Sequence, residues 1–164
     1  VDVYWGDERC VPHDDPDSNY LLAREALLDR VGAANATHLM RCGEVDAYQL
    51  RVGDLGRFDL VHLGLGPDGH TASLFDGSEA LEADPGRWVS LNDDPTGRNP
   101  HQRMTLTLSG IARARLVVFT VEGEHKADAL AAVARGDDVP ATRVEAERIV
   151  WLVDEAAASR LPDT

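Results

Sequence analysis

The chain has 164 residues, of which 43% are hydrophobic, and this is enough to bury one core, so we expect a single domain over residues 1–164. Its 16 basic and 29 acidic side chains give a formal charge of −13, which opposes binding to nucleic acid or to an anionic membrane surface. A small anionic ligand is compatible with this charge, because a few cations inside a cleft can dominate locally.

The two cysteines, Cys10 and Cys42, are far apart and have no C-x-x-C spacing, so neither a redox pair nor a zinc site is expected. We predict reduced thiols. No apolar run approaches the roughly 20 residues that span a bilayer, and the first ten residues lack the basic and apolar parts of a signal peptide. These features predict a soluble protein with a cytoplasmic location.

The first segment, "VDVYWG", alternates and carries β-branched and aromatic side chains, so we expect a strand over residues 1–5. This strand starts at the first residue without a preceding loop, which suggests that an N-terminal part of the domain is missing. A polar loop, residues 7–17, is expected next. The segment "SNYLLAREALLDRV" then predicts a helix, with Asp17 or Ser18 as its cap and Gly32 as its stop.

Three later runs, "DLVHLGLG", "ARLVVFTVEG" and "ERIVWLVD", are apolar at consecutive positions, which is typical of strands buried on both faces of a sheet. The segment "EHKADALAAVARG" lies between the last two and predicts a helix that ends at Gly136. Weaker strand candidates are "WVSL" and "RMTLTL". This alternation of strands and helices predicts an α/β fold with a largely parallel sheet.

The loop after the first of these runs, residues 64–70, has the G-x-G-x-x-G spacing of a dinucleotide-binding site. However, Pro67 removes an N–H donor, Asp68 would repel a pyrophosphate, and the segment after Gly69 is too short for the usual helix. We therefore disfavour nicotinamide or flavin binding. The alternative is a sharp turn that presents Asp68 and His70 at the carboxyl edge of the sheet, where ligands of open α/β sheets bind.

His70 is a candidate general base, because histidine changes its charge near neutral pH and can take a proton from water. Spacing alone does not distinguish this role from that of a structural loop histidine. A second polar group, Asp7 to Arg9, also follows a strand and would face the same edge. There Arg9 could grip a phosphate or carboxylate with two hydrogen bonds, or pair with Asp7 or Glu8.

Neither a metal site nor a serine nucleophile is indicated. The six histidines form no H-x-x-x-H pair and no cluster with cysteine, and no G-x-S-x-G motif surrounds a serine. The D-x-D-x-N string at Asp15 starts like a calcium loop, but Tyr20 occupies the position that requires glycine. We expect no metal.

Several strings together resemble the 6-phosphogluconolactonases, which share a fold with the glucosamine-6-phosphate deaminases. They are "WGDERCVP" with "SNY", "FDLVHLGLGPDGHTASLF", "RMTLTL", "GEHKADAL" and "IVWLVDEAA". The resemblance implies an α/β fold with a three-layer, mostly parallel, Rossmann-like sheet of the glucosamine-6-phosphate deaminase and ribose-5-phosphate isomerase type. It also implies N-terminal truncation, since nothing here matches the βα region whose Ser/Thr- and Gly-rich turn helps hold the phosphate in the family.

The activity that the resemblance implies is hydrolysis of 6-phospho-D-glucono-1,5-lactone to 6-phospho-D-gluconate in the oxidative pentose phosphate pathway, without a cofactor. It implies that His70 is the general base on water and that Asp7 and Asp68 belong to the same site. The implied residues for the substrate and its phosphate are Arg9, Gly69, Thr71 and Lys126. The partner is then a small sugar phosphate, and we expect a monomer or a weak homodimer.

Two alternatives remain open. A deaminase is disfavoured because Phe75 stands where deaminases have a glutamate that supports the catalytic histidine; Asp76, in turn, replaces a proline common in the lactonases. The other alternative is a truncated, non-catalytic domain that binds sugar phosphates or is purely structural. A missing strand and helix would expose apolar sheet surface, which favours association.

Overall fold

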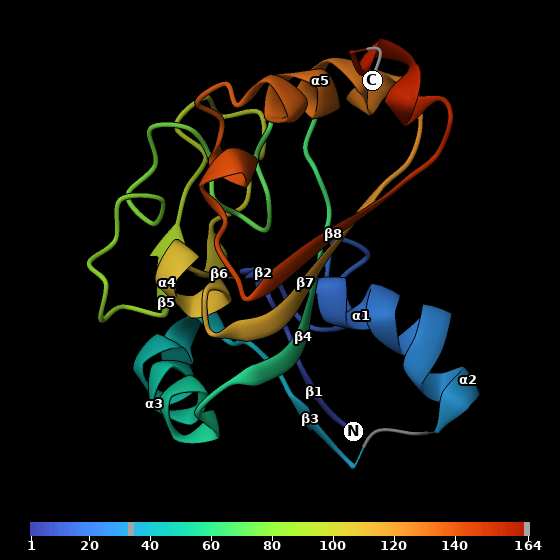
Figure 1. Cartoon of the computed structure of the whole chain (residues 1–164). Coiled ribbons are helices and arrows are strands. Elements are labelled where there is room, and N and C mark those ends of the chain that lie inside the picture. Colours follow the sequence, from blue (N-terminus) through green and yellow to red (C-terminus); the bar gives the residue numbers. More distant parts are fainter. Residues whose placement is uncertain (33–34, 163–164) are drawn as a thin grey trace.

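The computed structural model describes residues 1–32 and 35–162, which form three sheets and the helices packed beside them (Figure 1). One parallel sheet has the strand order β4 (Phe58–Leu63), β7 (Ala114–Val121), β8 (Arg148–Val153). A second parallel pair is β1 (Asp2–Tyr4) with β3 (Ala36–His38). An antiparallel sheet has the order β2 (Asp7–Arg9), β6 (Arg103–Leu106), β5 (Val89–Asn92). The predicted α/β fold with mainly parallel strand pairs is confirmed.

The helices begin and end largely where capping residues predict. The predicted N-terminal helix is a continuous segment of α1 (Asn19–Ala23), a π-helical turn (Arg24–Leu28) and α2 (Asp29–Val31). Ser18 is its N-cap, and Gly32 ends it with a left-handed backbone at φ 54°. The other helices are α3 (Val45–Leu55), α4 (Leu108–Ile111) and α5 (Ala127–Arg135). No helix in the described ranges is both long and apolar enough to cross a membrane.

The prediction of a polar loop over residues 7–17 is wrong for the first three residues, which form β2. This strand is hard to recognise because Asp, Glu and Arg are not typical strand residues. Its central residue, Glu8, is 2% exposed and accepts hydrogen bonds from the Ser18 hydroxyl and from the backbone N–H groups of Asn19 and Tyr20. Glu8 therefore secures the start of α1, where a negative charge is favourable.

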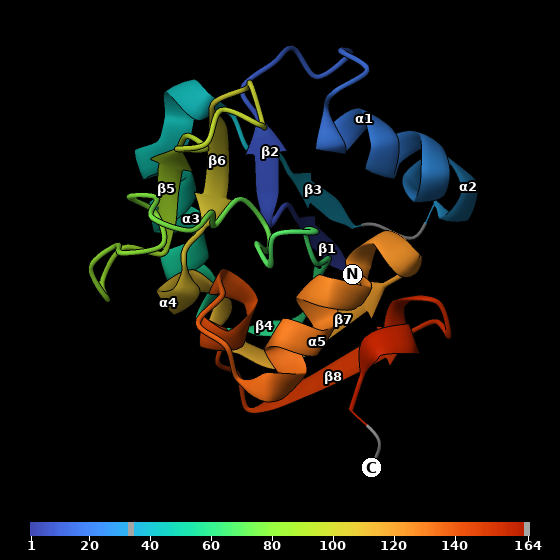
Figure 2. The same ribbon diagram turned by 90° about the horizontal axis from the view of Figure 1, so that it is seen from above.

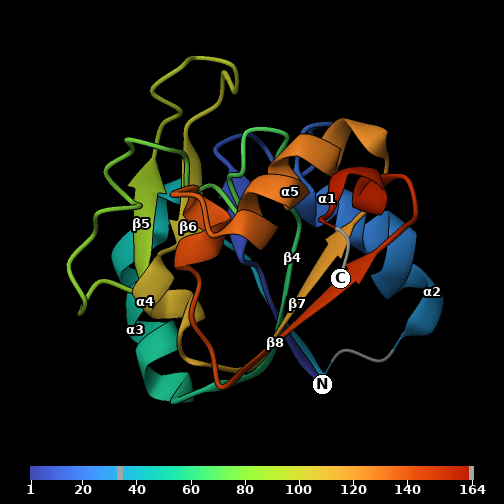
Figure 3. The same cartoon turned by 45° about the horizontal axis from the view of Figure 1, so that its top comes forward.

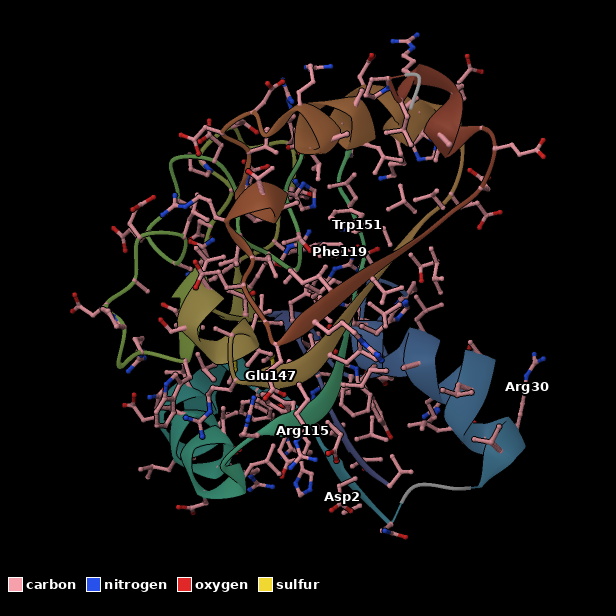
Figure 4. The ribbon with its side chains drawn as sticks, in the orientation of Figure 1. Asp2, Arg30, Arg115, Phe119, Glu147 and Trp151 are labelled. Atoms are coloured by element: carbon pink, nitrogen blue, oxygen red, sulfur yellow. A yellow bond between two sulfur atoms is a disulfide. The ribbon has the colours of Figure 1, made fainter. Side chains whose placement is uncertain are left out.

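The two faces of the β4–β7–β8 sheet differ. On one face Val117, Phe119 and Val121 are buried in the main core, and Phe119 stacks on Trp151 of β8 with ring centres 3.9 Å apart (Figure 4). On the other face Leu60 and Leu152 are 52% and 55% exposed. The expectation that these strands are buried on both faces is therefore wrong for the described part of the chain, where one face leaves apolar side chains exposed.

The prediction of reduced thiols is wrong for this structure, in which Cys10 and Cys42 form a disulfide with their Cα atoms 5.6 Å apart. The bond joins the segment after β2 to the segment after β3. Because β1 and β3 run side by side in the same direction, the chain leaves both strands at one edge, and this brings together cysteines that are 32 residues apart. Local spacing does not reveal such a pairing.

The carboxyl ends of β4 and β7 define where a site can form. Both strands run in the same direction and are adjacent, so the segments that follow them emerge at one edge of the sheet. Seen from above, the loop after β4 passes between β2 and α5 (Figure 2). Helix α5 lies beside the 3₁₀ turn Ala157–Arg160, near the ends of β7 and β8 (Figure 3).

Candidate active site

The loop after β4 is a tight turn whose glycines allow close packing. The Gly66 N–H donates to the His70 carbonyl (2.7 Å), and the Gly69 N–H donates to the Gly66 carbonyl (3.0 Å). A Cβ added at Gly66 would lie 2.1 Å from Nδ1 of His70. Glycine at position 66 is therefore what lets the imidazole fold back over the turn. These N–H groups serve the loop itself, and the described residues after Gly69 form turns rather than the helix that a dinucleotide site uses.

Asp68 and His70 form a hydrogen-bonded pair. Asp68 Oδ1 lies 2.5 Å from Nδ1 of His70 and also accepts the backbone N–H of His70 at 3.2 Å. Partial burial acts to raise the pKa of Asp68, but these contacts outweigh it and lower the pKa below its ordinary value. An ionised carboxylate can only accept, so the proton of this bond belongs to Nδ1, and Nε2 keeps a free lone pair. This is the tautomer that the predicted role of general base requires.

Asp7 of β2 is joined to the same loop through Ser73. Asp7 Oδ2 accepts the Ser73 hydroxyl (2.7 Å), Oδ1 accepts the side-chain amide of Asn19 (3.2 Å), and Arg103 Nη1 lies 3.9 Å away. Burial raises the pKa of Asp7 above its ordinary value, although the Ser73 hydrogen bond and the Arg103 charge act in the opposite direction. The structure thus places Asp7 beside the loop that carries His70.

Gly69 and Thr71 shape the loop. Gly69 has φ +85°, and a Cβ there would lie 2.7 Å from Cβ of Val139, so the residue permits both a left-handed turn and a close contact. Thr71 is 1% exposed and its hydroxyl donates to the Gly64 carbonyl (2.8 Å). The expected substrate contact of Thr71 is not supported, because its hydroxyl is buried and already used. Ala72 beside it has φ +47°, a strained conformation for a residue with a Cβ.

The expected phosphate residues occupy two different places. Arg9 forms no ion pair with Asp7 or Glu8 in the described residues; its Nη1 donates to the backbone carbonyl of Asp17 instead. Lys126 is half-buried and is the residue directly before α5, as predicted. No hydrogen bond or ion pair in the described ranges joins Lys126 to His70, Asp7 or Arg9, but its segment and the His70 loop leave the same sheet edge.

Three residues that the sequence analysis did not assign to the site complete the surroundings: Asn19, Ser73 and Arg103. All three lie in strings that carry the family resemblance: "SNY", "FDLVHLGLGPDGHTASLF" and "RMTLTL". Within residues 1–32 and 35–162 no group of three or more His, Cys, Asp or Glu side chains could hold a metal ion. Two surface cavities, of about 130 and about 300 Å³, lie beside α3 and around the disulfide; Arg9 borders the larger one, and His70 lines neither.

Comparisons with known sequences show which family this chain belongs to. Residues 1–151 match a sequence profile described as "Glucosamine-6-phosphate isomerases/6-phosphogluconolactonase". The 6-phosphogluconolactonase of Mycobacterium tuberculosis is 40% identical over 184 aligned residues, which cover 99% of this chain and 74% of the relative. That of Synechocystis is 36% identical, covering 98% of this chain and 73% of the relative.

Solved structures give the same picture. The 6-phosphogluconolactonase from Trypanosoma cruzi superimposes with a TM-score of 0.78 at 29% identity, over 97% of this chain and 72% of that one. The enzyme from Thermotoga maritima superimposes with a TM-score of 0.77 at 32% identity, over 92% and 71%. A monomeric glucosamine-6-phosphate deaminase superimposes with a TM-score of 0.75 at 20% identity, over 96% and 73%, a likeness of fold alone.

Proposed function

Because the chain belongs to the glucosamine-6-phosphate isomerase and 6-phosphogluconolactonase family, we propose that it hydrolyses 6-phospho-D-glucono-1,5-lactone to 6-phospho-D-gluconate. The observation that carries the proposal is the Asp68–His70 pair, held on a glycine turn beside Asp7 at the carboxyl edge of the parallel sheet. An enzyme with this activity is a carboxylic ester hydrolase and acts in the oxidative pentose phosphate pathway.

In the proposed mechanism His70 Nε2 takes a proton from water as the water oxygen attacks C1 of the lactone. Asp68 holds the imidazole in the required tautomer and stabilises the imidazolium that forms. The tetrahedral oxyanion then collapses, the bond between C1 and the ring oxygen breaks, and the proton passes from His70 to that oxygen. Water is consumed, the ring opens, and the product is a carboxylic acid that ionises.

The remote phosphate supplies the binding energy that fixes C1 opposite His70. We assign this phosphate to Arg9 and Lys126, because a guanidinium offers two parallel donors and an ammonium beside a helix N-terminus offers a compact positive charge. Arg9 belongs to β2 and Lys126 lies directly before α5, and the loop after β4 passes between these two elements (Figure 2).

A deaminase is a weaker candidate for this chain. Its catalytic histidine would need support from a carboxylate where Phe75 stands, and Phe75 is 2% exposed with its ring 4.9 Å from that of His70. An apolar ring cannot replace a carboxylate in proton transfer. This neighbour favours hydrolysis over ring opening and deamination.

The test is hydrolysis of freshly generated 6-phosphogluconolactone by the purified chain, corrected for spontaneous opening, alongside His70→Asn. We expect the variant to lose about 10²- to 10⁴-fold in kcat, the usual contribution of a general base. His62→Asn is the matched control, because His62 is exposed on the outer face of β4 and contacts Thr120. A His70→Asn enzyme with the wild-type rate would contradict the mechanism. A folded wild type that binds 6-phosphogluconate but does not hydrolyse the lactone would favour the non-catalytic alternative.

Location and assembly belong to the same proposal. A cytoplasmic enzyme acting on a small sugar phosphate, as a monomer or weak homodimer, fits the expectations from sequence. Leu60 and Leu152 are exposed, and uncovered apolar side chains favour association between copies of the chain. The oligomeric state should therefore be measured. Sedimentation over a range of protein concentrations would separate a monomer from a weak dimer.

A further inference from the structure

Arg9 of β2 and Arg103 of β6 are directly opposite each other in the antiparallel ladder. Directly opposite residues project to the same face of a sheet, and like charges in such a pair are destabilising. Asp7 and Thr105, the next pair on that face, lie two residues along, and Asp7 contacts the His70 loop through Ser73. The arginine pair therefore shares a sheet face with the proposed site.

The guanidinium of Arg103 is buried but poorly satisfied. The residue is 7% exposed, its Nη2 donates to Asn99 Oδ1 at 3.3 Å, and its Nη1 is 3.9 Å from Asp7 Oδ2. Its Nε has no hydrogen-bond partner in the described residues, and the same holds for Nε of Arg9. Asp7 is a weak counter-ion, because it already accepts hydrogen bonds from Ser73 and Asn19.

Arg103 also faces the catalytic side. Its guanidinium carbon lies 5.8 Å from the centre of the Phe75 ring, and the His70 ring lies 4.9 Å from the same centre. Burial, and after it the positive charge of Arg9, lowers the pKa of the Arg103 guanidinium. Two neighbouring cations repel each other, and a bound dianion would offset this repulsion.

We propose that Arg103 is a substrate-positioning residue that, together with Arg9, binds the phosphate of the sugar lactone. The inference rests on the proposed function for the identity of the substrate. Two arginines at opposite positions on one sheet face suit a phosphate monoester, which carries close to two negative charges and three acceptor oxygens. Asn99 and Phe75 hold the Arg103 side chain so that little ordering is needed on binding.

The experiment compares two substrates, 6-phosphogluconolactone and the unphosphorylated glucono-1,5-lactone, in wild type and in Arg103→Gln. We expect kcat/KM for the phosphorylated lactone to fall 10- to 100-fold, mainly through KM, while that for the unphosphorylated lactone changes less than threefold. Arg103→Lys keeps the charge and should recover part of the loss. Arg98→Gln removes an exposed arginine from the preceding loop and is the matched control. Equal losses for both lactones would mean that Arg103 only supports Asp7, and would overturn the proposal.

A binding measurement separates this inference from the proposed function. Calorimetric titration of 6-phosphogluconate and of gluconate into each variant needs no turnover. Weaker binding of 6-phosphogluconate alone in Arg103→Gln supports the inference even if the wild type hydrolyses nothing. The same affinity in wild type and Arg103→Gln, or no binding to wild type, contradicts it whatever the rate of hydrolysis. Circular dichroism and thermal unfolding establish that each variant is folded.

Discussion

Asp68 Oδ1 accepts two hydrogen bonds from His70, one from the ring Nδ1 at 2.5 Å and one from the backbone N–H at 3.2 Å. The carboxylate therefore fixes both the position of the histidine in the turn and the tautomer of its ring. Because the two residues are separated by Gly69 alone, one short turn holds the whole pair. Its integrity is the first thing to test.

Replacing Asp68 by Asn should lower kcat by about 10²-fold or more, since the imidazole loses its fixed tautomer and its counter-ion. KM should change little, because Asp68 does not bind the remote phosphate in our proposal. Steady-state kinetics on 6-phosphogluconolactone checks this. Asp76→Asn, which removes an exposed acid of the same loop, should behave like wild type. An unchanged kcat in the Asp68→Asn enzyme would show that Asp68 has no part in the mechanism.

Replacing Gly66 by Ala should displace His70, because the new Cβ would fall 2.1 Å from Nδ1. We expect a loss of activity of similar size to that of His70→Asn, with a decrease of about 1–3 kcal/mol in the free energy of unfolding from overpacking. Gly64→Ala is the control, since a Cβ there meets nothing within 4 Å. Activity assays and urea unfolding of both variants provide the measurement, and full activity in Gly66→Ala would contradict the described geometry.

Acid should weaken the turn that precedes β6. Asp94 accepts hydrogen bonds from the backbone and side chains of Thr96 and Asn99, which outweigh the opposing effect of burial and lower its pKa to about 2. A carboxyl whose pKa is lowered on folding stabilises the protein above its unfolded pKa of about 3.9, and this contribution disappears as the pH falls towards 2.

Asp94→Asn should therefore reduce the free energy of unfolding at pH 7 by about 1–2 kcal/mol, a value below the full linkage figure because solvent screens part of the effect. The difference between wild type and variant should shrink at pH 2.5. Urea unfolding at both pH values tests this, with Asp84→Asn, an exposed acid, as control. A difference that stays constant with pH would show that ionisation of Asp94 is irrelevant.

The disulfide predicts a redox-dependent stability. Cys42→Ser should lower the free energy of unfolding by about 3 kcal/mol in the absence of reductant, because the bond closes a loop between residues 32 apart in sequence. With dithiothreitol the two proteins should unfold at nearly the same urea concentration. Thiol titration of the unfolded wild type gives an independent check: two free thiols without reductant would contradict the bond.

Much of the fold could be predicted because its signals are local. The runs that became β4, β7 and β8 are rich in Val, Leu and Ile, and Gly136 ends α5 with φ +75° as its position predicts. Strand β2 could not be predicted, since its three residues are all charged and are stabilised by pairing with β6 and by capping of α1.

The site was only partly predictable for the same reason. Asp68 and His70 are neighbours in sequence, so the turn itself indicates them. The Ser73 hydroxyl donates to Asp7, which is 66 positions away in sequence. Arg103 lies opposite Arg9 because of the register of a short antiparallel sheet. Neither contact has a local pattern, and the Cys10–Cys42 pairing likewise depends on which strands are neighbours.

The contact between Gly66 and the His70 ring also bears on how the gene can vary. Every single-base missense change of a glycine codon gives an amino acid with a Cβ, and at position 66 that atom would overlap the imidazole. Gly64, only two codons away, has open space around it. In a saturation library selected for activity, the codon for residue 66 should therefore tolerate only synonymous changes, while the codon for residue 64 should accept small substitutions.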